Sequence, residues 1–334
     1  MTMEQRALGA TGVDVSRFIL GCGNFGGIGS APEFFGQGES EQEAHALMDA
    51  AWEMGVTTFD TADAYGGGRS ESYIGSWLAK KSSATRDRVV VTTKLYHSVD
   101  GDPADSGLSP ERIRRCVEAS LTRLGLEHVP LYMTHQPDPD TPIDDTLGAL
   151  DAEIDRGTIG AFGGCNLSDR ELGAAVEASV VQDIRRYEWV QNSYNLLERG
   201  DEGGVLPFCG EMGLGYTPFG PLAGGWLAGR YTALGQYPSG SRMTLRTEPY
   251  GRFENPLTFK ALDSIAELAA EYGIDTATLS LAWLSDEPNV TAVVLGPRRA
   301  EHLEPAARAL ELDFDRRARE RLDQIANELA AATG

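Results

Sequence analysis

The chain alternates short strand-like runs with amphipathic segments eight times, and this rhythm limits its fold more than any other feature. The runs are residues 18–21, 57–60, 89–94, 129–135, 159–163, 189–191, 214–217 and 290–295. Between them, segments such as 110–124 place apolar residues at the spacing of one helix face. Strands that alternate with helices form a parallel sheet. The sequence therefore predicts an α/β fold, a (β/α)8 TIM barrel.

Three segments fall outside this rhythm. Residues 6–15 carry Gly9 and Gly12 between short apolar stretches and predict a β-hairpin ahead of the barrel. Long connections follow the first and seventh strands, at 26–40 and 222–256. Loops of this length are usually functional or disordered. Because both leave the carboxyl ends of strands, we expect them to rim the pocket.

Four reactive side chains stand at or just past the carboxyl ends of three successive strands. Asp60 ends the second strand and Tyr65 follows it, Lys94 ends the third strand, and His135 ends the fourth. In a TIM barrel these ends converge on the face that holds the active site. A carboxylate, a phenol, an ammonium and an imidazole that are distant in sequence can therefore meet in one pocket.

These four groups suit the reduction of a carbonyl to an alcohol. A free phenol, with a pKa of about 10, is a poor acid at neutral pH. An ammonium such as Lys94 lowers the pKa of a nearby phenol, here Tyr65, and Asp60 can fix the position of that ammonium. His135 can donate a hydrogen bond to the carbonyl oxygen. Each residue alone could be a turn, loop or core residue; the four in this order and spacing indicate catalysis.

On these residues the chain resembles the aldo-keto reductase superfamily of NADP-dependent oxidoreductases. The resemblance runs from residue 6 to about residue 302 and includes the segments 138–142, 163–168, 191–195 and 216–225. It implies that Asp60, Tyr65, Lys94 and His135 form the catalytic tetrad.

The same resemblance implies NADPH or NADP as the cofactor, with NADH also possible. It places the nicotinamide against Tyr216, and Cys165, Asn166 and Gln191 around its carboxamide. The glycines of 217–224 would let the backbone approach the pyrophosphate closely. The other cofactor-binding residues that it implies are Thr217, Pro218, Phe219, Gly220, Leu222, Gly224, Gly296, Arg298, Arg299 and His302.

Two arginines end the last strand. Arg298 and Arg299 precede the start of a helix, a setting that suits a phosphate, and the resemblance implies that they hold the 2′-phosphate of NADP. The alternative is a solvated basic turn. Pro305 and Ala306 stand where the family commonly has Glu-Asn, and Cys165 stands where it usually has serine. These departures imply a weaker or different adenine site and one weaker hydrogen bond.

The acidic composition excludes several classes of partner. The net charge is −21, with 50 acidic and 29 basic residues among 334, which argues against nucleic acid or an anionic membrane. No apolar run is long enough to span a bilayer. The N-terminus lacks a basic patch followed by an apolar core, so we expect a cytoplasmic protein.

The four cysteines form no CxxC pair and no cluster with histidine. We therefore expect free thiols and no metal site. No linker or low-complexity tract interrupts the chain, which predicts one domain over 1–334. Its oligomeric state is not indicated by the sequence.

The sequence thus predicts an enzyme that reduces an aldehyde or ketone, a sugar or natural-product carbonyl among them, with NADPH and with Tyr65 as the general acid. One alternative is a binding protein with weak turnover that retains the cofactor as a redox sensor. In another, the cofactor stays bound while a sugar or natural product is transiently oxidised and reduced.

Overall fold

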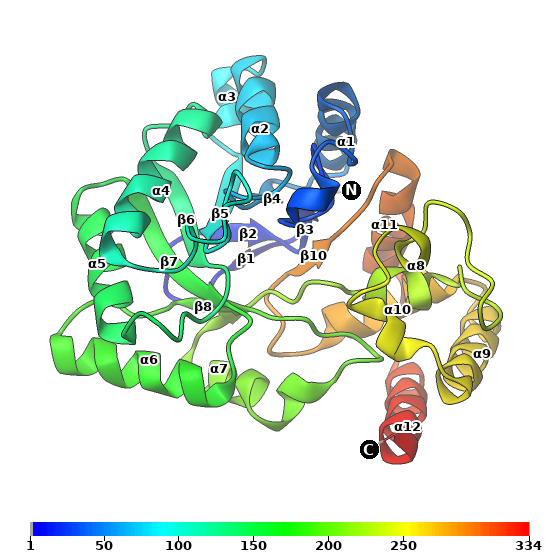
Figure 1. The fold of residues 1–334 in the computed structure, drawn as a ribbon. Helices are drawn as coiled ribbons and strands as arrows, with labels where there is room; N and C mark the ends of the chain where they lie inside the picture. The colour runs from blue at the N-terminus through cyan, green and yellow to red at the C-terminus, as the bar shows by residue number, and fades with distance from the viewer. Residues whose placement is uncertain (1–2, 334) are drawn as a thin grey trace.

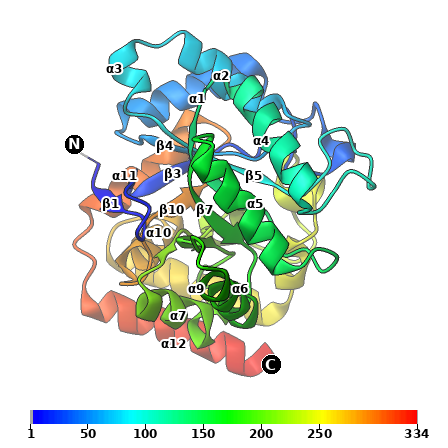
Figure 2. The same ribbon diagram turned by 90° about the vertical axis from the view of Figure 1, so that its left-hand side faces the viewer.

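The computed structural model describes residues 3–333 and shows parallel strands curled into a barrel with helices around it (Figure 1). The view in Figure 2 is turned by 90° and shows the helices packed along the outside of the strands. The strands, in their order around the barrel, are β10 (Val293–Leu295), β3 (Phe18–Gly21), β4 (Thr58–Asp60), β5 (Val90–Leu95), β6 (Val129–Thr134), β7 (Ile159–Cys165), β8 (Trp189–Gln191) and β9 (Gly215–Tyr216).

The barrel closes between β9 and β10. The backbone N–H of Thr291 donates to the carbonyl of Tyr216 over 2.8 Å, and the N–H of Val294 donates to that of Pro218 over 2.9 Å. Each of the eight predicted runs overlaps one of these strands, and β5 and β7 extend one and two residues beyond their runs. The predicted (β/α)8 fold is confirmed.

Helices follow the strands where the periodicity predicts them. Ser40 and Ser168 cap their helices, each in a reciprocal pair with the glutamate three residues later, and Ser109 caps the helix that Pro110 begins. The helices are α1 (Glu41–Glu53), α2 (Arg69–Ala79), α3 (Ser83–Arg86), α4 (Pro110–Leu124), α5 (Ile143–Asp155), α6 (Asp169–Gln182), α7 (Val205–Met212), α8 (Arg242–Leu245), α9 (Pro256–Glu271), α10 (Thr276–Asp286), α11 (Glu304–Glu311) and α12 (Arg316–Thr333). Within residues 3–333, none of the helices combines the length and the apolar character needed to cross a membrane.

The predicted hairpin closes the amino-terminal end of the barrel. Strands β1 (Gln5–Ala7) and β2 (Asp14–Ser16) pair antiparallel. Leu8 and Val15, from the hairpin, belong to the same buried cluster as Leu131 and Met133 inside the barrel. The hairpin therefore leaves the opposite end of the barrel, where the strands finish, open to a ligand.

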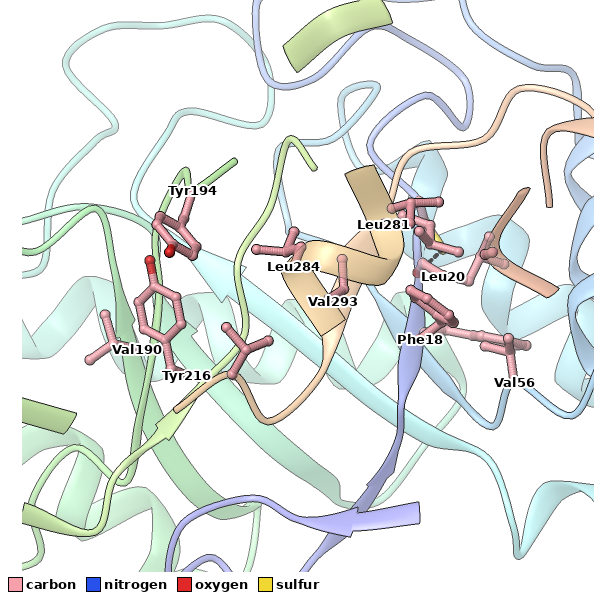
Figure 3. Close-up of a cluster of buried hydrophobic side chains, with 14 of the residues drawn as sticks. Phe18, Leu20, Val56, Val190, Tyr194, Tyr216, Leu281, Leu284 and Val293 are labelled. Carbon is pink, nitrogen blue, oxygen red and sulfur yellow. Dashed lines mark hydrogen bonds between the residues drawn. The ribbon is translucent and has the colours of Figure 1, made fainter. Parts of the chain in front are cut away.

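The side chains of the barrel strands alternate between two buried layers. Those of Ile19, Leu131 and Trp189 point inward, whereas Phe18 and Val190 belong to the larger layer between the strands and the helices. Figure 3 shows part of this outer layer, to which the barrel strands and α10 contribute. Because neighbouring parallel strands in register share a face, the pairing register decides which side chains can reach the pocket.

The two long connections meet at the open end of the barrel, as the sequence predicts. Arg242, on α8, donates from Nη2 to Oδ1 of Asn24, and Arg246 donates from Nη1 to the carbonyl of Ile28 over 3.3 Å. The N–H of Gly66, next to Tyr65, donates to the carbonyl of Gly29 over 3.1 Å. The connections therefore border the loop that carries Tyr65.

Substitution of Gly9 tests how the hairpin docks. Gly9 has a φ of +53°, and a Cβ there would lie 2.2 Å from the carbonyl oxygen of Glu188, whereas Gly12, with a φ of +73°, has open space around it. We expect Gly12→Ala to cost roughly 1–2 kcal/mol, the cost of a left-handed backbone with a Cβ. Gly9→Ala adds a steric clash and should cost about 3 kcal/mol or more. Urea unfolding measures both, and equal losses would show that the close approach is not rigid.

Candidate active site

A buried ion pair lies at the carboxyl ends of β4 and β5. Lys94 Nζ lies 2.5 Å from Oδ1 of Asp60 and donates to the carbonyl of Thr61 over 2.9 Å. Lys94 is 0% exposed and Asp60 is 2% exposed. Burial alone would lower the pKa of the Lys94 ammonium, but the carboxylate of Asp60, together with Tyr65 and Cys165, more than offsets burial, and the pKa is raised. Lys94 is therefore a permanent cation beneath the pocket.

Gln191 holds the other oxygen of this carboxylate. Its Nε2 donates to Oδ2 of Asp60 over 2.9 Å, across the barrel from β8. The prediction placed Gln191 at the nicotinamide carboxamide, and the role of partner to Asp60 was missed because nothing in the sequence links residues so far apart. The contact shows that Gln191 points into the barrel.

Tyr65 lies beside the ion pair and near the imidazole of His135. Its hydroxyl is 3.4 Å from Nε2 of His135, and Lys94 Nζ lies 5.2 Å from the centre of its ring. Burial raises the pKa of the Tyr65 phenol to about 12, and the Lys94 ammonium opposes this rise without overcoming it. The ammonium does act to lower the pKa of Tyr65, as expected, but the effect of burial is larger and the pKa is raised.

His135 is neutral at physiological pH. Burial lowers its pKa well below the usual value, and the charge of Lys94 and the ring of His97 add to this. Asn166 Nδ2 donates to the carbonyl of His135 over 2.9 Å, while the ring of His97 lies edge-on, with centroids 5.0 Å apart. All four predicted catalytic residues thus meet in one place, with a neutral imidazole next to the phenol.

Tyr216, the predicted partner of the nicotinamide, lies in the outer layer and not on the inner face of the barrel. Tyr216 pairs in register with Val190, whose side chain faces away from the barrel interior because Gln191, the next residue, faces into it. Tyr216 is 0% exposed, and its hydroxyl donates to Oδ2 of Asp201 over 2.7 Å. Figure 3 shows it beside Val190 in the outer layer, pointing toward Tyr194.

Other predicted cofactor residues do face the pocket side. Cys165 pairs in register with Gln191 and shares its inward face. Burial raises the pKa of the Cys165 thiol to about 12, so it stays protonated. Phe219 packs against the barrel-interior cluster and remains partly exposed, while Asn166 is exposed at the end of β7. Phe219 is therefore the aromatic ring of this segment that a ligand can reach.

The segment after β9 turns through several glycines. Gly220 and Gly224 have positive φ of +66° and +65°. Thr217 and Pro218 are buried, and Leu222 is half-buried. The left-handed turns at these glycines are compatible with the predicted close approach of this backbone to the pyrophosphate of the cofactor.

The two arginines after β10 behave differently. Arg298 Nε donates to Oε1 of Glu39 over 2.8 Å, and the backbone N–H of Arg298 donates to Nδ1 of His302. Arg299 is exposed, and its Nη1 lies 3.5 Å from Oε1 of Glu301. Of the pair, Arg298 is thus the one that the fold holds in a defined place. Glu39, which the sequence patterns did not single out, is 5% exposed.

Two further positions bear on the predicted adenine site. Gly296 is exposed at the end of the last strand. Ala306 is fully buried on α11, so the position that commonly bears asparagine in the family offers no polar side chain here.

Within residues 3–333 the structure shows neither a disulfide nor a metal cluster at this site. The four cysteines are unpaired and buried. Among residues 3–333, no three histidine, cysteine or acidic side chains gather in a way that could hold a metal ion.

A family model described as "Aldo/keto reductase family" matches residues 19–327. The chain belongs to this family. It is accordingly an oxidoreductase whose general chemistry is carbonyl reduction.

Three curated relatives align over nearly the whole chain. The chain is 35% identical to the uncharacterized oxidoreductase YrpG of Bacillus subtilis, over 97% of this chain and 96% of that protein. It is 32% identical to an L-glyceraldehyde 3-phosphate reductase of Escherichia coli, over 96% and 92%. It is also 32% identical to a probable voltage-gated potassium channel subunit beta of Oryza sativa, over 93% and 92%.

Asp63, two residues before Tyr65, is a second buried acid next to the pair of Asp60 and Lys94. Both carboxyl oxygens of Asp63 lack a partner within residues 3–333, and the residue is 0% exposed. Burial, with the nearby Glu71, raises the pKa of Asp63 to about 7. The N–H of Asp63 donates to the carbonyl of Lys94 over 2.9 Å, so this acid lies in the loop that carries Tyr65.

The pKa of Asp63 predicts a pH-dependent stability. The folded protein holds this proton more tightly than the unfolded chain, so its contribution to the free energy of unfolding is lost as pH rises from about 4 through about 7. Asp63→Asn removes this dependence. The free energy of unfolding of the variant, minus that of wild type, should therefore increase from pH 5 to pH 8, by no more than about 4 kcal/mol. Urea unfolding at both values tests this, and a difference that does not change with pH would contradict it.

Proposed function

We propose that this protein reduces an aldehyde or ketone to the alcohol with NADPH, and that Tyr65 is the proton donor. The observation that carries the proposal is the meeting of Tyr65, His135 and the buried Lys94–Asp60 pair at the open end of the barrel. The substrate that we propose is a small-molecule carbonyl compound in the cytoplasm.

The residues at the mouth of the barrel fit a dinucleotide. Phe219 offers a ring on the pocket side, and Asn166 is exposed at the end of β7. Farther along, Arg242, Arg246 and Arg298 are close enough that their charges act on one another, and within residues 3–333 only Arg298 of the three is in an ion pair with a carboxylate. In a chain of net charge −21, such a group of guanidiniums favours phosphates.

The tetrad divides the work in the proposed reaction. When bound, the nicotinamide would supply the hydride that the carbonyl carbon receives. The hydroxyl of Tyr65 donates its proton to the carbonyl oxygen, so that hydride and proton together complete the alcohol. The neutral imidazole of His135 donates a hydrogen bond to the same oxygen, and the Lys94 ammonium stabilises the phenolate that remains.

The alternative is a protein that retains the cofactor and turns over weakly. The relatives named as potassium channel beta subunits favour it. Multiple turnover of NADPH with a panel of aldehydes, ketones and keto sugars supports the reductase, whereas bound nucleotide without turnover supports the alternative.

Tyr65→Phe tests the assignment of the acid. It keeps the ring and removes the proton, so carbonyl reduction should fall by roughly 100-fold or more, the usual contribution of a general acid. Binding of NADPH, followed by protein fluorescence, should change little. Tyr272→Phe is the matched control, because it removes a phenol that bonds Asp315 outside the barrel. Turnover within a few-fold of wild type in Tyr65→Phe would rule out the proposed role.

Lys94→Met tests the ion pair. It leaves the carboxylate of Asp60 buried with Gln191 as its remaining donor, which should cost about 3–5 kcal/mol of stability. Reduction should also be lost, since nothing then stabilises the Tyr65 phenolate. The exposed Lys260→Met is the control for loss of one positive charge. Stability and turnover equal to those of the control would refute the role of Lys94.

A further inference from the structure

The arginine assigned to the 2′-phosphate already has a carboxylate partner. Arg298 Nε lies 2.8 Å from Oε1 of Glu39, and Arg298 Nη1 donates to the carbonyl of Gly240 over 3.1 Å. Glu39 is 5% exposed, and its other oxygen, Oε2, has no hydrogen-bond partner within the described part of the chain. One negative charge is therefore fixed directly against the guanidinium.

The backbone holds Glu39 in this position. Its N–H donates to the carbonyl of Asn24 over 2.8 Å, and its own carbonyl accepts from the N–H of Gly26 over 2.8 Å. The next residue, Ser40, caps α1. Because the backbone is tied on both sides, the carboxylate cannot leave Arg298 by a simple movement of the loop end.

An acid and an arginine have opposite effects at a dinucleotide ribose. A carboxylate accepts hydrogen bonds from the 2′-hydroxyl of NAD, and an arginine accommodates the 2′-phosphate of NADP. Here both groups occupy one ion pair. The carboxylate cancels much of the charge that would attract the phosphate, and it would repel the phosphate itself, whereas a ribose hydroxyl suffers neither effect.

We infer that Glu39 is a specificity-determining residue that lowers the preference of this protein for NADPH over NADH by sharing Arg298 with the 2′-phosphate. The inference rests on the proposed function, since it requires a dinucleotide at the mouth of the barrel. It assigns Glu39 no part in the chemistry of the carbonyl.

The test is the ratio of the two dissociation constants, NADH over NADPH, measured by fluorescence titration without substrate. Glu39→Gln keeps an acceptor for Arg298 Nε and removes the charge. It should raise the ratio roughly fivefold, the effect of one partly exposed charge pair, mainly through tighter NADPH. The exposed Glu41→Gln, which makes the same charge change two residues away, should leave the ratio unaltered. If Glu39→Gln does not fold, Glu39→Met removes the same charge, and its ratio of dissociation constants provides the test instead.

The outcomes distinguish a failure of the proposed function from a failure of the inference about Glu39. If wild type binds neither nucleotide, the proposed function itself is wrong. If both bind and Glu39→Gln leaves the ratio unchanged or lowers it, the inference is overturned and the proposed function stands. In an Arg298→Ala background, the further change Glu39→Gln should no longer alter the ratio, and a persisting fivefold gain would show that Glu39 does not act through Arg298.

Discussion

The ion pair between Lys94 and Asp60 is the constraint on which the site depends. Two charges that are 0% and 2% exposed are expensive to desolvate, and such a pair commonly contributes little net stability. Further hydrogen bonds support it: the Lys94 ammonium also donates to the carbonyl of Thr61, and the amide of Gln191 donates to the second oxygen of Asp60. Three strand ends are thereby held together around one carboxylate, and the loop that carries Tyr65 is fixed to the strand that carries Lys94.

Much of the fold could be predicted because local and global signals agree. Capped amphipathic helices alternate with short strands, and each of the eight predicted runs overlaps one barrel strand. The region between β9 and β10 could not be predicted in the same way. It holds α8, α9 and α10, and α10 is buried almost throughout, so its sequence shows no polar face that would reveal a helical period.

The catalytic residues were predictable for a reason that does not extend to the cofactor residues. Each member of the tetrad lies at or just past the carboxyl end of a strand, and a barrel brings these ends together on one face. The orientation of Tyr216 could not be predicted, because it depends on the alternation within β8 and β9, and only the pairing of Val190 with Tyr216 decides it. Glu39 was missed because its partner Arg298 is far away in sequence and no motif joins them.

The balance of charges around Tyr65 also bears on the direction of the proposed reaction. Burial keeps the pKa of the phenol at about 12, so the hydroxyl is protonated throughout the physiological range. Reduction needs this protonated form, whereas oxidation of an alcohol needs the phenolate as base. The neighbouring His135 is neutral, since burial and Lys94 lower its pKa, and it therefore adds no positive charge that would favour the phenolate. Lys94 is the cation that lies against the ring. The site is therefore suited to donate a proton at neutral pH, and alcohol oxidation should gain only as the solution becomes alkaline.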